Sequence, residues 1–172
     1  QLLERLRKTN ESVLHVLQRK SHARYRGVLY GEFIIVDGTI KVIEYNVRFG
    51  NPATINHLAL MQSDPLELLE GIAFGTLRTK HITFSNLFSV TAYALAKTAP
   101  LPSMHILDGI PSDNIYYATI HDSPNFRPMR SRVFALGIVG QDPNVLNSYV
   151  NSWMAPLQKW FHWRTDIGLG LI

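Results

Sequence analysis

The chain has 172 residues, 46% of them hydrophobic, and its 17 lysines and arginines against 13 acidic residues give a formal net charge of +4. It has no cysteine, which excludes disulfides and zinc–thiolate centres. No apolar run approaches the length of a transmembrane helix. A chain of this size can bury a core of its own, in one domain or in two small lobes.

The first half of the chain predicts a helix, a β-hairpin and two further helices. An apolar stripe at helical spacing opens the sequence, and we expect it to be exposed or to be covered by a partner. Two β-rich runs flank Asp37-Gly38, a pair that favours a tight turn because both residues tolerate positive φ. The expected elements are a helix over 2–20, strands over 25–36 and 39–46, a loop over 47–52, and helices over 53–61 and 66–76.

The second half predicts strands followed by a long helix. An apolar run over 87–96 indicates a buried strand, with a helix as the alternative. Strands over 115–121 and 132–139 flank a loop over 122–130, and a last helix covers 144–161. The apolar stripe of this helix is more typical of a core than of a base-stacking surface. Its members are Val145, Leu146, Tyr149, Trp153, Leu157 and Trp160.

Polar side chains follow the second hairpin strand at the point where it ends. Glu44, Asn46 and Arg48 are two residues apart, so they project to the same side of an extended strand. A carboxylate and an amide oxygen roughly 7 Å apart can converge on one hard cation. An arginine two residues further on is placed to hold a phosphate or a carboxylate with two hydrogen bonds. The pattern predicts a magnesium–phosphate site.

The hairpin register bears on this site. A two-residue loop puts Gly31 opposite Glu44, where the missing side chain leaves the carboxylate uncovered. On that register Glu44 and Asn46 continue the apolar face of Ile40 and Val42, and Glu32 points away from Glu44, so it is not counted as a ligand. The alternative is an ordinary hairpin with a solvated end, in which Glu44 and Arg48 form a surface ion pair.

Four segments together resemble a known family. The runs Tyr25–Ile34 and Lys41–Pro52, with Ser63-Asp64-Pro65-Leu66 and Arg164-Thr-Asp166-Ile-Gly168, are similar to phosphoribosylamine–glycine ligase (glycinamide ribonucleotide synthetase), an ATP-grasp family of purine biosynthesis. Where the family usually continues Arg-Phe-Gly with Asp-Pro-Glu, this chain has Asn51-Pro52-Ala53. Two acidic groups are thus replaced by neutral ones.

The resemblance implies an α+β fold. Residues 1–78 would be the C-terminal part of an ATP-grasp domain, an antiparallel sheet with helices, and residues 79–172 a small mixed C-terminal domain. It also implies a cytoplasmic enzyme without a membrane partner. Its adenine pocket and phosphate-clamping lysine would lie in an N-terminal half of the same protein, upstream of Gln1. We therefore expect this part of the protein to be inactive by itself.

The resemblance assigns roles to the site residues. Glu44 and Asn46 would hold Mg²⁺, or Mn²⁺, between the phosphates of ATP. Arg48 would be catalytic and, with the backbone of Gly50, would bind the phosphate or the substrate carboxylate. Arg164 and Asp166 would bind the substrates, glycine and phosphoribosylamine. In the family reaction ATP phosphorylates the carboxylate of glycine, and phosphoribosylamine attacks the acyl phosphate.

Two other functions stay open. Asn51 and Ala53 favour an ATP-grasp-like binding or regulatory subunit that has lost its activity. The basic residues among the first 26 suit a nucleic-acid-binding domain, although a solvated helix face is the commoner cause of such a pattern. Steep salt dependence of DNA or RNA binding would support the nucleic-acid function.

Overall fold

The computed structural model describes residues 1–22, 24–79, 81–97, 101–118 and 132–170. The chain combines α-helices with two antiparallel sheets, so the α+β class is confirmed. The chain divides into two compact units, Gln1–Thr54 with Ser63–Thr83, and Ile55–Gln62 with Phe84–Ile172. The loop expected over 122–130 lies outside the described residues.

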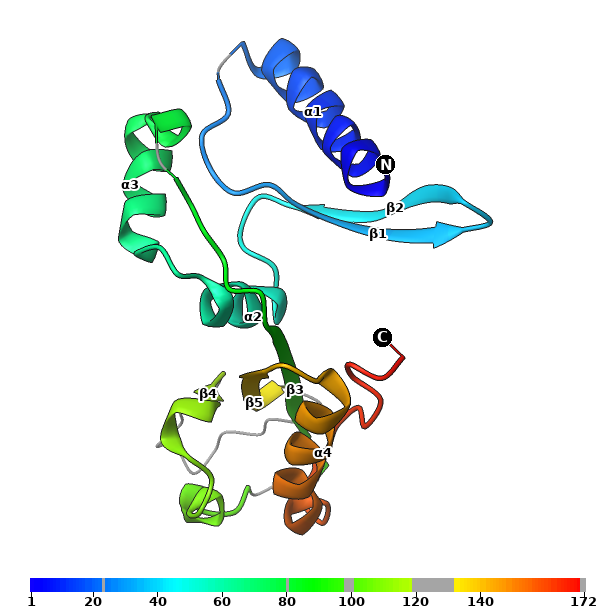
Figure 1. The fold of residues 1–172 in the computed structure, drawn as a ribbon, viewed down its shortest axis with the longest axis vertical. Coiled ribbons are helices and arrows are strands. Elements are labelled where there is room, and N and C mark those ends of the chain that lie inside the picture. The colour runs from blue at the N-terminus through cyan, green and yellow to red at the C-terminus, as the bar shows by residue number, and fades with distance from the viewer. Residues whose placement is uncertain (23, 80, 98–100, 119–131, 171–172) are drawn as a thin grey trace. The chain divides into compact units, whose positions relative to one another are not determined.

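The elements follow the predicted order, with different bounds (Figure 1). The α-helices are α1 (Leu2–Ser21), α2 (Ala53–Leu60), α3 (Pro65–Phe74) and α4 (Pro143–Met154). The strands are β1 (Tyr30–Val36), β2 (Thr39–Asn46), β3 (Phe88–Ala96), β4 (Ile115–Tyr117), β5 (Arg132–Gly140) and β6 (Phe161–His162). Short 3₁₀ helices are η1 (Leu77–Thr79), η2 (Met104–Leu107), η3 (Ser112–Asn114) and η4 (Ala155–Leu157).

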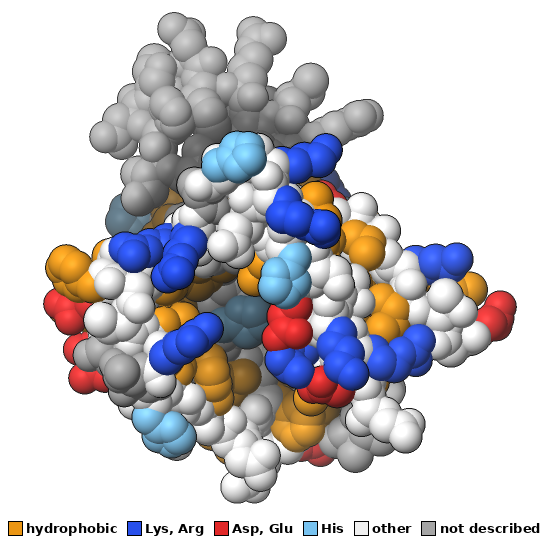
Figure 2. Space-filling view, turned by 90° about the horizontal axis from the view of Figure 1, so that it is seen from above, with side chains coloured by type: hydrophobic (Ala, Val, Ile, Leu, Met, Phe, Trp, Pro, Cys, Tyr) orange, Lys and Arg blue, Asp and Glu red, His pale blue; other side chains and the backbone are white. Residues whose placement is uncertain are grey.

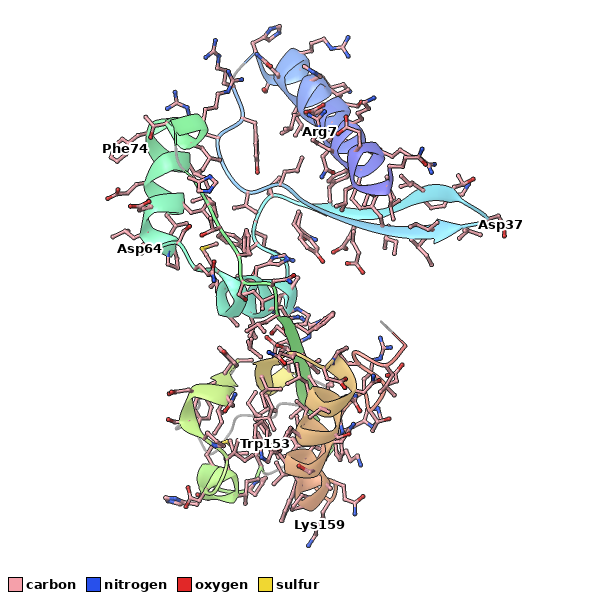
Figure 3. All side chains as sticks on the ribbon, in the orientation of Figure 1. Arg7, Asp37, Asp64, Phe74, Trp153 and Lys159 are labelled. Carbon is pink, nitrogen blue, oxygen red and sulfur yellow. The ribbon has the colours of Figure 1, made fainter. Side chains whose placement is uncertain are left out.

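In the first unit, α1 lies along the β1–β2 hairpin (Figure 1). Asp37 and Gly38 both have positive φ, 49° and 70°, and form the two-residue turn that the sequence predicts. Figure 3 shows Asp37 at the tip of the hairpin. Arg5 donates to the carbonyl of Gly38 at 3.1 Å, and the hydroxyl of Tyr45 donates to Asn10 Oδ1 at 3.0 Å. These bonds attach the N-terminal half of the helix to the turn of the hairpin and to a point near its open end.

The first unit buries little of its apolar surface. No residue of α1 is fully buried, and Leu3 keeps 81% of its surface exposed. The stripe that was expected to be exposed consists of Leu3, Leu6, Val13, Leu14 and Leu17. The expectation is confirmed for Leu3 and, at 36% exposure, for Leu17, whereas Leu6, Val13 and Leu14 are half-buried. On the hairpin, Ile34 and Ile43 are exposed as well.

Helix α3 begins one residue earlier than the sequence predicts and ends two residues earlier, and caps define both ends. The side chain of Asp64 accepts a hydrogen bond from the N–H of Leu66 at 2.9 Å, which satisfies one of the unpaired N–H groups at the helix start. Gly75 has a φ of 71° and ends the helix at Phe74, with its N–H directed to the carbonyl of Ile72.

The second unit has a four-stranded antiparallel sheet with the strand order β4-β5-β3-β6. Helix α4 packs against β3 and β5, and apolar side chains of all three elements form the core. Its most buried large side chains include Phe134 and Phe161, whose rings meet edge to face with centroids 5.1 Å apart. Every buried hydrophobic residue in the described part of the chain belongs to this unit.

The last helix differs from its prediction in length and in its buried face. It ends at Met154 because Pro156 has no N–H to continue the helical ladder. The chain then forms η4 and returns as β6, which pairs with β3. Leu146 and Leu157 are buried as expected, but Val145 and Tyr149 are exposed, so the prediction of a core role is wrong for these two.

Candidate functional site

A β-bulge sets the register at the open end of the hairpin. Val36 pairs with Thr39 as predicted, and the strands remain in step as far as Phe33 and Val42. The register then shifts, and Glu32 pairs with Glu44 while Gly31 pairs with Tyr45. The extra residue is Ile43, which has no partner on β1. The predicted pairing of Gly31 with Glu44 is therefore wrong.

The bulge also changes which face carries the polar groups. Glu44 and Asn46 do lie on one face, since Asn46 Nδ2 donates to Glu44 Oε1 at 2.5 Å. The sequence predicts that this is also the face of Ile40 and Val42, and that prediction is wrong. The extra residue Ile43 reverses the alternation of side chains, so Ile40 and Val42 lie on the opposite face. The other face carries Tyr45, whose ring meets Phe33 edge to face at 5.9 Å and whose hydroxyl bonds to α1. Partial burial on that face raises the pKa of Tyr45.

Glu32 lies on the same face as Glu44, so the prediction that it points away from Glu44 is wrong. Residues paired directly across an antiparallel ladder share a face, with Cβ atoms about 5 Å apart. Two carboxylates in this arrangement repel each other unless a cation lies between them. Among the described residues, neither Glu32 nor Glu44 forms an ion pair with a lysine or an arginine. This face thus offers two exposed acidic groups and one amide.

The donor set fits a hard divalent cation. Mg²⁺ and Mn²⁺ prefer carboxylate and amide oxygens, and Glu32, Glu44 and Asn46 supply these from neighbouring positions. Asn46 directs its Nδ2 toward Glu44, and half a turn about the Cβ–Cγ bond would bring its Oδ1 to the same place. The described part of the chain contains no group of three or more histidine, cysteine or acidic side chains placed to hold a metal.

Arg48 follows the strand and is exposed. Its Nη1 donates to the carbonyl of Phe49 at 2.9 Å, so the guanidinium lies against its own loop. The alternative surface ion pair between Glu44 and Arg48 is not formed. A guanidinium has five N–H donors, and several of them are available to an incoming anion.

Gly50 is required by close packing. It is fully buried, and a Cβ there would lie 2.7 Å from the ring of Tyr30. Its carbonyl accepts hydrogen bonds from the N–H of Thr54 at 3.0 Å and from the hydroxyl of Thr54 at 2.6 Å. These contacts join the loop that carries Arg48 to the first turn of α2.

Arg164 and Asp166 are brought together in the second unit. Arg164 Nε and Nη2 donate to the two carboxylate oxygens of Asp166 at 3.0 and 2.7 Å, and both side chains are largely exposed. The hydrogen bond from Arg164 lowers the pKa of Asp166, and the pKa of Arg164 is raised by the same bond. The pair is a preformed, two-point contact on the surface.

The basic surface of the first unit is partly neutralised within α1. Arg7 pairs with Glu4 at 2.7 Å and also with Glu11, and Lys8 lies 3.9 Å from Glu4. Figure 2 shows cationic side chains with acidic ones between them on the face seen there. Mixed charge of this kind is typical of a solvated helix face, and it weakens the argument for nucleic-acid binding. None of the helices in the described part of the chain combines the length and the hydrophobicity of a membrane span.

Comparison with known proteins agrees with the resemblance seen in the sequence. Residues 3–54, which include the hairpin and its acidic face, match the family model "Phosphoribosylglycinamide synthetase, ATP-grasp (A) domain". The chain is similar to phosphoribosylamine–glycine ligases from several organisms. That of Methanoregula boonei is 32% identical over 165 residues, which cover 91% of this chain and 38% of the relative. That of Thermococcus gammatolerans is 29% identical over 174 residues, 96% of this chain and 38% of the relative.

A further relative, from Methanosarcina barkeri, is 30% identical over 124 residues, 70% of this chain and 29% of the relative. The chain thus spans about a third of the length of the curated relatives it matches.

Proposed function

Because the chain is a divergent relative of the phosphoribosylamine–glycine ligases, we propose that it supplies the metal- and phosphate-binding end of an ATP-dependent carboxylate–amine ligase. One observation carries the proposal. The segment that matches the ATP-grasp model presents Glu32, Glu44 and Asn46 on one open face of a two-stranded hairpin. In the proposed reaction ATP phosphorylates glycine, and phosphoribosylamine then displaces the phosphate.

Glu44 and Asn46 would be the metal ligands, and Glu32 would add a third oxygen donor. When bound, Mg²⁺ or Mn²⁺ neutralises charge on the phosphates of ATP as the γ-phosphoryl group moves. The two carboxylates carry the negative charge that makes this face attractive to a divalent cation. Both are exposed, so they remain accessible from solvent.

Arg48 would be the catalytic group that holds the transferring phosphate or the carboxylate of glycine. It has the donors for a two-point contact, and the buried Gly50 fixes the loop on which it lies. Gly50 would add its backbone to the same anion site. Arg164 would bind an anionic group of glycine or of phosphoribosylamine, and Asp166 would take part in this substrate site by orienting the guanidinium in advance.

The exposed apolar surface of the first unit suits a large partner. We propose that α1 and the hairpin pack against an N-terminal half of the same protein, which would bring the adenine pocket and the phosphate-clamping lysine. The matched part covers only 38% of the Methanoregula boonei relative, and Leu3 and Ile34 are exposed in this chain. On this proposal the chain by itself is inactive, and the complete enzyme works in the cytoplasm.

The proposal is tested by glycine-dependent ADP formation in the full-length protein, with phosphoribosylamine as the second substrate. Glu44→Gln keeps the shape of the side chain and removes its charge, so turnover should fall about 100-fold or more while the melting temperature changes little. Glu70→Gln, an exposed position on α3 in the same unit, is the matched control and should leave turnover unchanged. Full activity in Glu44→Gln would contradict the proposal.

A second function rests on Asn51 and Ala53, which replace two acidic residues of the family pattern beside the proposed metal site. On this alternative the protein binds nucleotide but does not turn it over, as a binding or regulatory subunit. The same assay separates the two functions. A parent protein that binds ATP with Mg²⁺ but forms no ADP with either substrate would support the inactive subunit.

A further inference from the structure

A network of two asparagine amides in the second unit holds the segment that carries the exposed Arg164–Asp166 pair. Asn147 and Asn151 are one turn apart on α4, and Asn147 is only 7% exposed. Asparagine amides are seldom buried unless their hydrogen bonds are satisfied, because an unpaired buried amide costs a few kcal/mol. These two amides bond to each other, Asn151 Nδ2 donating to Asn147 Oδ1 at 2.8 Å.

The remaining donors of the network hold one stretch of backbone. Asn147 Nδ2 donates to the carbonyls of Thr165 and Ile167, both at 2.8 Å, and Asn151 Nδ2 donates to Thr165 at 3.0 Å. The indole N–H of Trp163 donates to Asn151 Oδ1 at 2.8 Å. Three consecutive odd-numbered positions, 163, 165 and 167, are therefore tied to the same two side chains of α4.

The chain beyond this stretch is fixed as well. Gly168 has a φ of 87°, and a Cβ there would lie 2.9 Å from the Val90 side chain in the core. The N–H of Leu169 donates to the carbonyl of Asp166 at 3.2 Å. The segment that carries Arg164 and Asp166 is held on its inner side by α4 and at its end by the core.

The even-numbered side chains of the segment have the opposite surroundings. Arg164 and Asp166 have 73% and 59% of their side-chain surface exposed, and their main contact is with each other. Asp166 occupies Nε and Nη2 of the guanidinium, so the two N–H groups of Nη1 remain for another acceptor. An arginine held in this way meets an oxyanion with little further loss of side-chain freedom.

We infer that Asn147 and Asn151 are positioning residues, which hold segment 163–167 so that Arg164, backed by Asp166, binds an oxyanion of the substrate. The inference rests on the proposed function for the role of Arg164. Both substrates of the proposed reaction carry such a group, the carboxylate of glycine and the phosphate of phosphoribosylamine. The amides act through the backbone of residues 165 and 167 and do not touch the anion themselves.

The test is equilibrium binding to the full-length protein by titration calorimetry, with glycine and ribose 5-phosphate as separate probes. Arg164→Met identifies which probe this arginine binds. Asn151→Asp has nearly the same shape but lacks the N–H donors to Thr165 and Asn147, and Trp163→Phe removes one donor without adding charge. Both variants should bind the probe that Arg164→Met identifies about tenfold more weakly than the parent does, because each disturbs groups that position the binding arginine. Affinity for the other probe should stay unchanged.

Ser148→Ala is the matched control, because Ser148 lies between the two asparagines and bonds only to the carbonyl of Asn144 within the helix. It should change neither affinity. Thermal melts of all variants separate positioning from stability, since a purely structural role lowers the melting temperature and leaves the affinity of the folded protein intact.

Unchanged probe affinity in Asn151→Asp and Trp163→Phe overturns the inference, and so does a parent that binds neither probe. The proposed function can fail separately. If the parent forms no ADP but its affinity for a probe depends on Arg164 and Asn151, the ligase proposal is wrong and the positioning role stands. If the parent is active, Asn151→Asp should also raise the KM of the substrate with that anion more than it lowers kcat.

Discussion

The two units differ in how they use their apolar residues. In the second unit, apolar side chains from the central strands and α4 meet in a closed core. In the first unit, the described residues that are fully buried are two glycines, Gly50 and Gly71, while isoleucines of the hairpin remain exposed. The second unit therefore has a closed core of its own, and the first leaves apolar surface exposed, as the proposed packing against an N-terminal half requires.

The same difference separates the two proposed sites. On the acidic face of the hairpin, Glu32 and Glu44 are exposed, and among the described residues neither carboxylate forms an ion pair with a lysine or an arginine. The Arg164–Asp166 pair is exposed too, but four side-chain hydrogen bonds from Asn147, Asn151 and Trp163 fix the segment 163–167 that carries the pair. We expect changes in the second unit to act through stability and position, and changes on the hairpin face to act through charge.

The largest effect on stability is expected in the second core. Phe134→Ala removes a fully buried ring that packs on Phe161 and should lower the free energy of unfolding by about 3–5 kcal/mol. Ile43→Ala, at the exposed bulge of the hairpin, should cost less than about 1 kcal/mol. Denaturant unfolding followed by tryptophan fluorescence checks the first variant, because all three tryptophans lie in the second unit. Far-UV circular dichroism follows the second.

A smaller effect is expected from glycines with positive φ. Gly168→Ala combines backbone strain with a Cβ placed 2.9 Å from the Val90 side chain, and should cost about 2–4 kcal/mol. Gly38→Ala, at the hairpin turn, meets no atom within 4 Å and should cost the strain alone, about 1–2 kcal/mol. The unfolding midpoints of the two variants measure the loss of stability. Equal losses would show that the backbone at Gly168 can shift away from Val90 and is not packed tightly on the core.

The smallest effect concerns pH. The pKa of Asp166 is lowered in the folded protein by its bond to Arg164. The stability from this pair is thus fully present above the ordinary carboxyl pKa, and it is lost as the pH falls through the lowered value. Both side chains are exposed, so the change in stability should be slight. NMR titration should find that Arg164→Met raises the pKa of Asp166, and an unchanged pKa would contradict the pairing.

Much of the fold follows from local signals in the sequence. Asp37-Gly38 specifies the hairpin turn, Asp64-Pro65 the start of α3, and the spacing of Arg164 and Asp166 permits their ion pair. Pro156 also marks the end of α4 in the sequence, but the helix predicted over 144–161 was extended beyond this proline.

Other features depend on contacts between distant residues. The bulge at Ile43 accompanies the packing of Phe33 and Tyr45 beside α1, and nothing in the local sequence distinguishes it from regular alternation. For this reason the prediction placed Glu32 on the wrong face. The amide network likewise joins positions 12 to 20 residues apart, so neither Asn147 nor Asn151 stands out in the sequence.

We propose above all that the acidic face of the hairpin holds a divalent cation together with the nucleotide. The most direct measurement is Mn²⁺ binding to the full-length protein in the presence of a non-hydrolysable ATP analogue, followed by electron paramagnetic resonance. We predict that Glu44→Gln and Glu32→Gln each weaken Mn²⁺ binding about tenfold or more, because each removes a charged oxygen donor. Glu70→Gln should bind as the parent does. Parent-like Mn²⁺ affinity in both Glu32→Gln and Glu44→Gln would contradict the account.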